Sequence, residues 1–219
     1  ISLWGGSIRF NTPMLFAVSF LPMFGIGGLT GLPLGLNVAD IPLHDTYYVI
    51  GHFHYVVAPG TIFALFAGVY YWFPKATGRK MNDTLGAIHF WGSFICINIV
   101  FMPMFIQGLS GMNRRMYDGG AQYKYNAGLP LKLNVVIGMA AWTLGLFQLP
   151  FIYNFFTSIF WGKTVDKNPW EATTLEWSAP SPPGHGNFLT EPIVYRAPYE
   201  YSVPGAAKDF SPQFEPEKA

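Results

Sequence analysis

Long uncharged runs dominate the pattern of hydrophobic and polar positions in the first three quarters of the chain. Each run has 29 or 30 residues, and together they cover residues 10–39, 46–74, 84–113 and 133–162. A helix that crosses a bilayer needs roughly 20 predominantly apolar residues, so each run can span and still reach both headgroup layers. The pattern predicts four transmembrane helices, over about residues 10–36, 46–74, 84–110 and 133–162.

Prolines inside these runs include Pro13, Pro22, Pro33, Pro59, Pro103 and Pro150. In a membrane-embedded bundle, neighbouring helices can satisfy the carbonyl groups that a proline leaves without a donor. We therefore expect kinks at these prolines rather than helix ends.

The last part of the chain, residues 163–219, has a different composition. It holds 9 of the 18 prolines and 13 of the 25 charged residues, and we find no internal repeat in the chain. Such a density of proline disfavours long helices and sheet ladders. The sequence therefore predicts an all-α transmembrane bundle over residues 1–162, followed by an extended, Pro-rich tail over residues 163–219.

The distribution of positive residues near the ends of the runs gives an orientation. Six lie on the side that holds both termini: Arg9, Lys75, Arg79, Lys80, Lys163 and Lys167. Four lie on the other side: Arg114, Arg115, Lys124 and Lys132. Because positive residues are enriched on the inner side of membrane proteins, we expect the termini and the tail on the cytoplasmic or matrix face.

The composition agrees with a membrane protein and excludes several other classes. Hydrophobic residues make up 51% of the chain and charged residues only 11%, against about 25% charged in soluble domains. A water-soluble enzyme, a disordered regulator and a disulfide scaffold with its single cysteine, Cys96, are therefore excluded. A net charge of +1 gives no argument for a nucleic-acid partner. We find no signal peptide, and the absence of an initial Met suggests part of a longer protein.

Two histidines, His52 and His54, lie in the otherwise apolar second run, where an ionisable side chain is costly and is a functional candidate. At about 100° per residue, positions two apart point to nearly opposite faces of a helix. The two imidazoles can therefore bind two separate cofactors, such as two haem irons, but not one metal ion together. The alternative is that each imidazole forms a hydrogen bond with a neighbouring helix.

Polar residues gather at the outer end of the same run. His44 and Asp45, close to Asp40, have the side-chain types that hold a divalent cation, although two ligands are too few and others must come from elsewhere. Alternatively, Asp45 caps the second predicted helix. Arg114 and Arg115 either reach for lipid headgroups or bind paired carboxylates.

The other histidines have simpler interpretations. His89, near the inner end of the third run, is expected to be structural, and His185, in the tail, is expected to be exposed.

Several motifs resemble the C-terminal part of subunit I of the haem-copper oxidases, specifically of cytochrome c oxidase. In the membrane region they are Trp4-Gly5-Gly6-Ser7-Ile8, Gly27-Gly28-Leu29-Thr30-Gly31, His44-Asp45-Thr46-Tyr47-Tyr48, His52-Phe53-His54 and Gly108-Leu109-Ser110-Gly111-Met112-Asn113-Arg114-Arg115. In the tail they are Asn168-Pro169-Trp170, Thr173-Thr174-Leu175-Glu176-Trp177 and Pro180-Ser181-Pro182-Pro183. The similarity extends to about residue 188.

This resemblance implies roles for the two histidines of the second run. His52 would be the proximal ligand of the high-spin haem at which oxygen is reduced, and so the catalytic residue of this chain. His54 would be a ligand of the low-spin haem that supplies the electrons. Both haems would be of the haem a type, and the ligands of the copper at the oxygen-reducing centre would lie outside this chain.

The resemblance also assigns the outer polar residues. His44 and Asp45 would contribute to a magnesium or manganese site at the border with subunit II. Arg114 and Arg115 would pair with haem propionates, and Asp40 would lie near those of the high-spin haem. Asp45 favours cytochrome c as the electron donor, because the related quinol oxidases tend to have asparagine at this position.

The family pattern is incomplete in this chain. It has only five histidines, and each already has another assignment, so none can be assigned as a copper ligand. Gly184 also stands where the family often has a third proline. The chain therefore resembles about the last four of twelve helices, as a natural split, a proteolytic product or an incomplete chain, and we expect it to be inactive alone.

In the whole enzyme its partners would be the rest of subunit I, subunits II and III, cytochrome c and membrane lipid. Its location would be the bacterial cell membrane or the mitochondrial inner membrane. The alternatives are a quinol-oxidising relative, a non-enzymatic transmembrane haem carrier and a proton-coupled transporter without cofactor.

Overall fold

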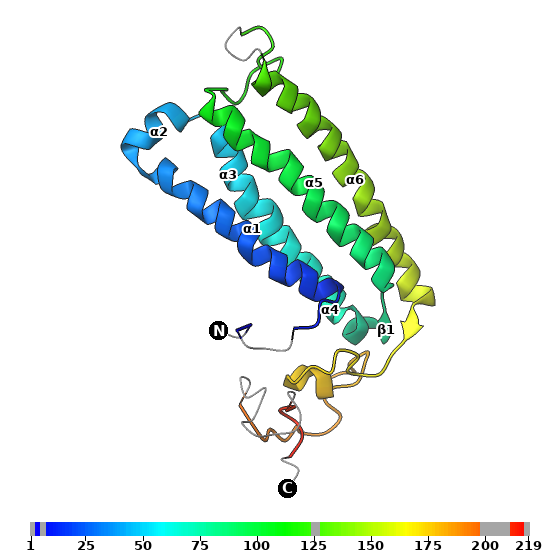
Figure 1. Cartoon of the computed structure of the whole chain (residues 1–219). Coiled ribbons are helices and arrows are strands. Elements are labelled where there is room, and N and C mark those ends of the chain that lie inside the picture. The colour runs from blue at the N-terminus through cyan, green and yellow to red at the C-terminus, as the bar shows by residue number, and fades with distance from the viewer. Residues whose placement is uncertain (1–2, 5–7, 124–127, 198–210, 217–219) are drawn as a thin grey trace. The chain divides into compact units, whose positions relative to one another are not determined.

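The computed structural model describes residues 3–4, 8–123, 128–197 and 211–216. Gly5, Gly6 and Ser7 of the first family-like motif and Lys124 of the outer side lie outside the described residues, as does 198–210 of the predicted tail. Four helical segments are long and apolar enough to cross a membrane, namely Thr12–Gly35, Tyr47–Thr77, Asp83–Leu109 and Leu129–Trp161. The predicted all-α bundle with four spans is confirmed (Figure 1).

The chain forms two compact units, which we describe separately. The helical unit contains residues 11–68 and 83–153, and the tail unit contains residues 1–10, 69–82 and 154–219. The second and fourth spans each contribute to both units. The predicted division after residue 162 therefore remains a description of the sequence, and the side of the membrane on which the tail lies remains a prediction.

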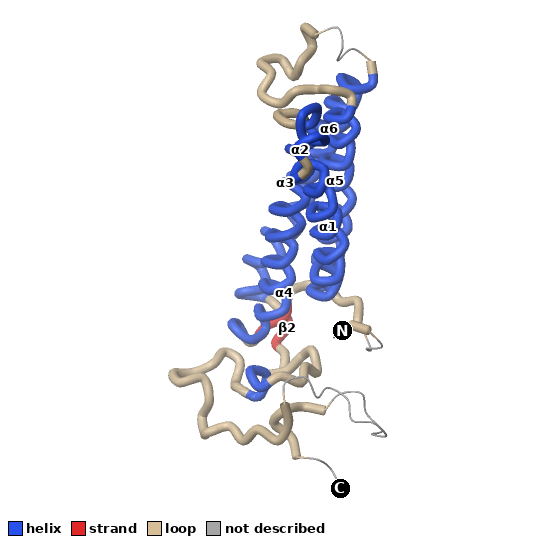
Figure 2. The backbone as a smooth tube through the Cα atoms, turned by 90° about the vertical axis from the view of Figure 1, so that its left-hand side faces the viewer, coloured by secondary structure: helices blue, strands red, loops and turns tan. Residues whose placement is uncertain are grey.

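The helices follow one another in this order: α1 (Thr12–Gly35), α2 (Asn37–Leu43), α3 (Tyr47–Val57), the π-helical turn η1 (Ala58–Ile62), α4 (Phe63–Thr77), α5 (Asp83–Leu109) and α6 (Leu129–Trp161). All of them belong to the helical unit except the parts of α4 and α6 beyond residues 68 and 153. Helix α3 packs against both α1 and α5. Figures 1 and 2 show these three helices side by side along a common direction, with the short α2 at the end where it connects α1 to α3. Helix α3 therefore has a neighbouring helix on two sides.

The helices continue through the prolines inside them, as expected, and Pro13 is the exception. Pro22, Pro33, Pro103 and Pro150 lie inside long helices. Pro59 lies in the π-helical turn that joins α3 to α4, which is a common response to a missing donor. The expectation for Pro13 was wrong, because Pro13 lies in the first turn of α1, where the N–H group has no partner in any helix.

Aromatic side chains pack together in the interior of the helical unit. Phe16, Tyr55 and Phe63 are fully buried, and the Phe16 ring meets the ring of Phe63 edge to face at 5.2 Å. The Tyr55 hydroxyl donates to Asn98 Oδ1 of α5 at 2.8 Å. These contacts join α1 to the start of α4 and α3 to α5.

The predicted tail has little regular structure, and in Figure 2 the described residues beyond β2 are almost entirely loop. Besides the ends of α4 and α6, the regular elements of the tail unit in the described residues are a two-residue antiparallel pairing of β1 (Arg79–Lys80) with β2 (Lys163–Thr164) and the 3₁₀ helix η3 (Leu175–Ser178). The pairing is a short exception to the expectation of no ladder. Other segments are fixed by side chains.

A buried lysine fixes the tail to the end of α4. Lys75 Nζ donates to the carbonyl oxygens of Ala179 at 2.7 Å and Lys167 at 3.0 Å, and it lies 5.0 Å from the centre of the buried Trp177 ring. A lysine that leaves water needs such partners, because an unpaired buried charge is costly. The tail therefore follows a defined path over this unit.

Candidate functional site

The turn that leads into α3 positions the candidate histidines. Thr46 is the N-cap of α3, because its Oγ1 accepts from the Tyr48 N–H at 3.2 Å and donates to the Leu43 carbonyl at 2.7 Å. The alternative in which Asp45 caps the helix was therefore wrong. Asp45 has a left-handed backbone, with φ of 58°.

His52 points from α3 toward α1. Its Nδ1 atom lies 2.7 Å from the carbonyl oxygen of Gly27. A carbonyl only accepts, so Nδ1 is the protonated nitrogen, and in the neutral ring the lone pair is on Nε2. This is the arrangement found in metal-binding histidines, whose second nitrogen donates to a backbone carbonyl or carboxylate.

Two glycines of α1 make room for this contact. A Cβ atom at Gly31 would lie 2.7 Å from His52 Cε1, and one at Gly27 would lie 2.8 Å from the backbone nitrogen of Val56. Both distances are shorter than a carbon atom tolerates. Glycine at these positions therefore lets α1 approach α3 closely enough to hold the imidazole.

His54 lies on the other side of α3, against α5. Its Nδ1 donates to the Ile50 carbonyl at 2.8 Å, within the same helix. The ring stacks on Phe101 of α5, with centroids 4.5 Å apart and planes at 14°. In this histidine too the proton is on Nδ1 and the lone pair on Nε2, and the two rings face different helices, as the spacing predicted.

His89 of α5 is bonded differently. It is fully buried, and its Nε2 lies 3.1 Å from Oε1 of Gln148 on α6. Gln148 Nε2 in turn donates to the Ser93 hydroxyl and the Leu144 carbonyl, which assigns its Oε1 as the acceptor from His89. In His89, Nε2 therefore forms a hydrogen bond between two helices, as expected for a structural residue, whereas in His52 and His54 the same nitrogen is left for a ligand. His185 is exposed.

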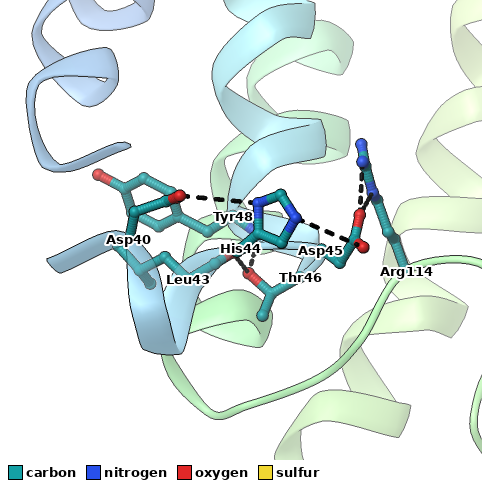
Figure 3. A network of polar contacts seen from close by, with 7 residues as sticks. All are labelled: Asp40, Leu43, His44, Asp45, Thr46, Tyr48 and Arg114. Carbon is teal, nitrogen blue, oxygen red and sulfur yellow. Dashed lines mark hydrogen bonds and ion pairs between the residues drawn. The ribbon is translucent and has the colours of Figure 1, made fainter. Parts of the chain in front are cut away.

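Figure 3 shows the polar cluster at the outer end of α3. His44 lies between two carboxylates, with Nδ1 3.6 Å from Asp40 Oδ2 and Nε2 3.7 Å from Asp45 Oδ2. Arg114 binds the same Asp45 carboxylate, with Nη2 at 2.5 Å and Nε at 2.7 Å. This guanidinium lowers the pKa of Asp45 below its ordinary value, so that the carboxylate stays ionised.

The site residues predicted from the sequence are brought together only in part. Asp40, His44, Asp45 and Arg114 form one cluster, whereas Arg115 is exposed, with a left-handed backbone of φ 64°. Among the described residues no three His, Cys, Asp or Glu side chains are arranged to hold a metal ion. A divalent cation at His44 and Asp45 therefore needs further ligands.

Backbone bonds join the two loops that carry this cluster. The Tyr47 N–H donates to the Met112 carbonyl at 3.0 Å, the Arg114 N–H donates to the Asp45 carbonyl at 2.8 Å, and Thr46 and Asn113 form a β-bridge. The loop after α5 is thus attached to the start of α3.

Sequence reasoning assigned no role to several residues that shape the site. Gly27, Thr30 and Gly31 of α1 contact His52, and Phe101 contacts His54. The spacing of Gly27 and Gly31, one helical turn apart, is the sequence signal of a close helix approach, but the partner helix is not evident from it.

Known proteins are similar to this chain in sequence and in fold. Residues 1–144 match the family model of cytochrome c and quinol oxidase polypeptide I. The chain is 46% identical over 218 residues to an alternative cytochrome c oxidase subunit 1 of Bradyrhizobium diazoefficiens, covering 99% of this chain and 37% of the relative. It is 48% identical over 204 residues to cytochrome c oxidase subunit 1 of Synechocystis, covering 92% of this chain and 35% of the relative.

The chain thus spans little more than a third of the length of these curated relatives. A chain in the cryo-EM structure of a haem-copper terminal oxidase dimer matches 70% of this chain with a TM-score of 0.60, at 19% identity, which supports the fold.

Proposed function

The chain belongs to the subunit I family of cytochrome c and quinol oxidases, and from that premise we propose that it is part of the catalytic subunit of a terminal respiratory oxidase. In the whole enzyme, electrons pass from cytochrome c through a low-spin haem to a haem-copper centre that reduces oxygen to water, coupled to proton translocation. This chain alone is inactive, because the copper ligands and the second ligand of the low-spin haem lie outside it.

The observation that carries the proposal is the bonding of His52 and His54. Each imidazole keeps its proton on Nδ1, bonded to a backbone carbonyl, and leaves the Nε2 lone pair for an iron. The two rings contact different helices, α1 and α5, which supports two separate haems, one for each histidine. We assign His52 to the high-spin haem and His54 to the low-spin haem.

The chain's own residues orient and tune these groups. When bound, the haem irons and the copper supply the redox chemistry. Gly27 fixes the orientation of the His52 ring, and the stacked Phe101 fixes that of His54. Arg114 and Arg115 neutralise the haem propionates, with Asp40 near those of the high-spin haem.

We assign the magnesium or manganese site to His44 and Asp45. Their oxygen and nitrogen donors suit such a cation, but Asp45 already binds Arg114, and two ligands do not complete a coordination shell. The remaining ligands therefore come from another chain, in keeping with a site at the border with subunit II. The partners are the rest of subunit I and subunits II and III, in a bacterial cell membrane.

The test is spectroscopy and metal analysis of the native complex. Reduced-minus-oxidised spectra are expected to contain two haem signals, and the preparation is expected to contain copper. His52→Ala should remove the oxygen-reactive high-spin haem and spare the low-spin haem, and His54→Ala should remove the low-spin signal.

Three results would contradict the proposal. Haem without copper would indicate a haem carrier, no haem would indicate a transporter, and equal loss of both haems in His52→Ala would refute the assignment of faces. Oxygen uptake with reduced cytochrome c but not with a quinol is expected, and the reverse would indicate the quinol-oxidising branch.

A further inference from the structure

Thr30, one helical turn from both Ile26 and Gly27, contacts the candidate haem ligand His52. Its Oγ1 lies 2.8 Å from the Ile26 carbonyl, 2.9 Å from the Gly27 carbonyl and 3.3 Å from His52 Nδ1. His52 Nδ1 itself lies 2.7 Å from the Gly27 carbonyl. A hydroxyl has a single proton, so it can donate fully to only one of these neighbours.

The lone pairs of the two carbonyl oxygens show which of them accepts the Thr30 proton. A carbonyl oxygen has two lone pairs, and the Gly27 oxygen already accepts the regular helix bond of α1 and the Nδ1–H of His52. Among the described residues, the Ile26 oxygen accepts its helix bond and no bond from another helix, so it has a lone pair left for the Thr30 hydroxyl. The shorter distance to Ile26 agrees, since threonine in a helix commonly bonds the carbonyl four residues before it.

Because the Thr30 hydroxyl donates its proton to the Ile26 carbonyl, it presents an oxygen lone pair to the His52 ring. Nδ1–H then has two acceptors, the Gly27 carbonyl at 2.7 Å and, more weakly, Thr30 Oγ1 at 3.3 Å. We propose that Thr30 is a positioning residue that supplies a second acceptor to the Nδ1–H of His52 and so strengthens electron donation from Nε2 to a bound haem iron. This inference rests on the proposed function, because it assumes that His52 binds iron.

The physical effect has a definite sign. More acceptors on Nδ1–H give the imidazole more imidazolate character, which strengthens the bond from Nε2 to the metal and favours the oxidised iron. Removing the Thr30 hydroxyl should therefore weaken the iron–histidine bond and raise the midpoint potential of that haem.

The experiment compares variants of the assembled complex. Thr30→Val keeps the shape of the side chain and removes the hydroxyl, and Thr30→Ser keeps the hydroxyl. Thr143→Val is the matched control, because the Thr143 hydroxyl is exposed and donates to the Met139 carbonyl four residues before it on α6, where no histidine is bonded to it. The readouts are the iron–histidine stretching frequency from resonance Raman spectra and the midpoint potential of each haem.

For Thr30→Val we expect a lower stretching frequency and a positive potential shift at the high-spin haem, with the low-spin haem unchanged. Thr30→Ser and Thr143→Val should match the unsubstituted complex. If Thr30→Val does not assemble, Thr30→Ala removes the same hydroxyl and is expected to give the same shifts.

An unchanged frequency and potential would overturn the inference and leave the proposed function intact. A shift in the opposite direction would also overturn it, since the hydroxyl would then donate to the Gly27 carbonyl. Absence of an iron–histidine band at His52 in the unsubstituted complex would refute the proposed function and the inference with it.

Discussion

Asp45 and Arg114, 69 positions apart in the sequence, are joined through both their side chains and their backbones. The guanidinium lies 2.5 and 2.7 Å from the carboxylate, and the Arg114 N–H donates to the Asp45 carbonyl at 2.8 Å. This double connection attaches the loop after α5 to the start of α3. It also places the positive guanidinium next to Asp45, one of the two proposed ligands of the cation.

Replacing Arg114 should loosen this connection. Arg114→Met removes the side-chain bonds and keeps the backbone bond, so we expect several-fold faster amide exchange at Tyr47 and at position 114, measured by hydrogen–deuterium exchange. Arg115→Met is the control, because Arg115 is exposed and lies outside the described cluster. Equal exchange in the two variants would show that the Arg114 side chain does not hold the loops together.

The Asp45–Arg114 pair should make stability depend on pH. Arg114 lowers the pKa of Asp45 from its ordinary value of 3.8, so the pair contributes stability above that value and loses it as the pH falls through the lowered pKa. Thermal unfolding should therefore show that Asp45→Asn destabilises the protein most above pH 3.8, and progressively less below it. Because the carboxylate is solvent-exposed, high salt should also reduce the difference. A difference that grows on acidification would contradict this account.

Gly31 should be essential for the orientation of His52. An alanine Cβ at this position would lie 2.7 Å from His52 Cε1, so Gly31→Ala must displace the imidazole or push α1 away from α3. We expect the loss of most of the high-spin haem absorbance in the purified complex, with the low-spin haem retained. Gly28→Ala on the same helix is the matched control, since nothing lies within 4 Å of its added Cβ. Similar haem loss in both variants would point to a general effect of α1.

Lys75 should hold the tail on the end of α4. Lys75→Met removes two bonds from an ammonium group to backbone carbonyls, each worth roughly 1.5–3 kcal/mol, so local opening of the tail should rise at least about tenfold. Limited proteolysis between residues 163 and 180 measures that opening. Lys163→Met is the control, because it changes an exposed lysine of β2, and the tail of this variant should be cleaved at the original rate. Unchanged cleavage in Lys75→Met would show that the remaining contacts suffice.

Much of the fold was predictable from local properties of the chain. Charged side chains are excluded from hydrocarbon, so the spacing of Lys75, Asp83 and Lys132 along the chain marks where spans end or begin, and the four spans follow. The helical period likewise separates His52 from His54, because residues two apart cannot share a face. Both results depend only on neighbours in sequence.

The details of the site depend on groups from distant parts of the chain, so only the tertiary structure decided them. The carbonyl of Gly27 determines which nitrogen of His52 keeps a lone pair, and it lies 25 positions away. The same applies to Asp45, which a local rule assigns to a helix cap but which binds Arg114 while Thr46 caps α3. By itself the sequence determined how many helices cross and where the candidate ligands lie, because burial and helical period are local. Hydrogen-bond partners, which determine the chemistry of each ligand, exist only once α1, α3 and α5 have packed.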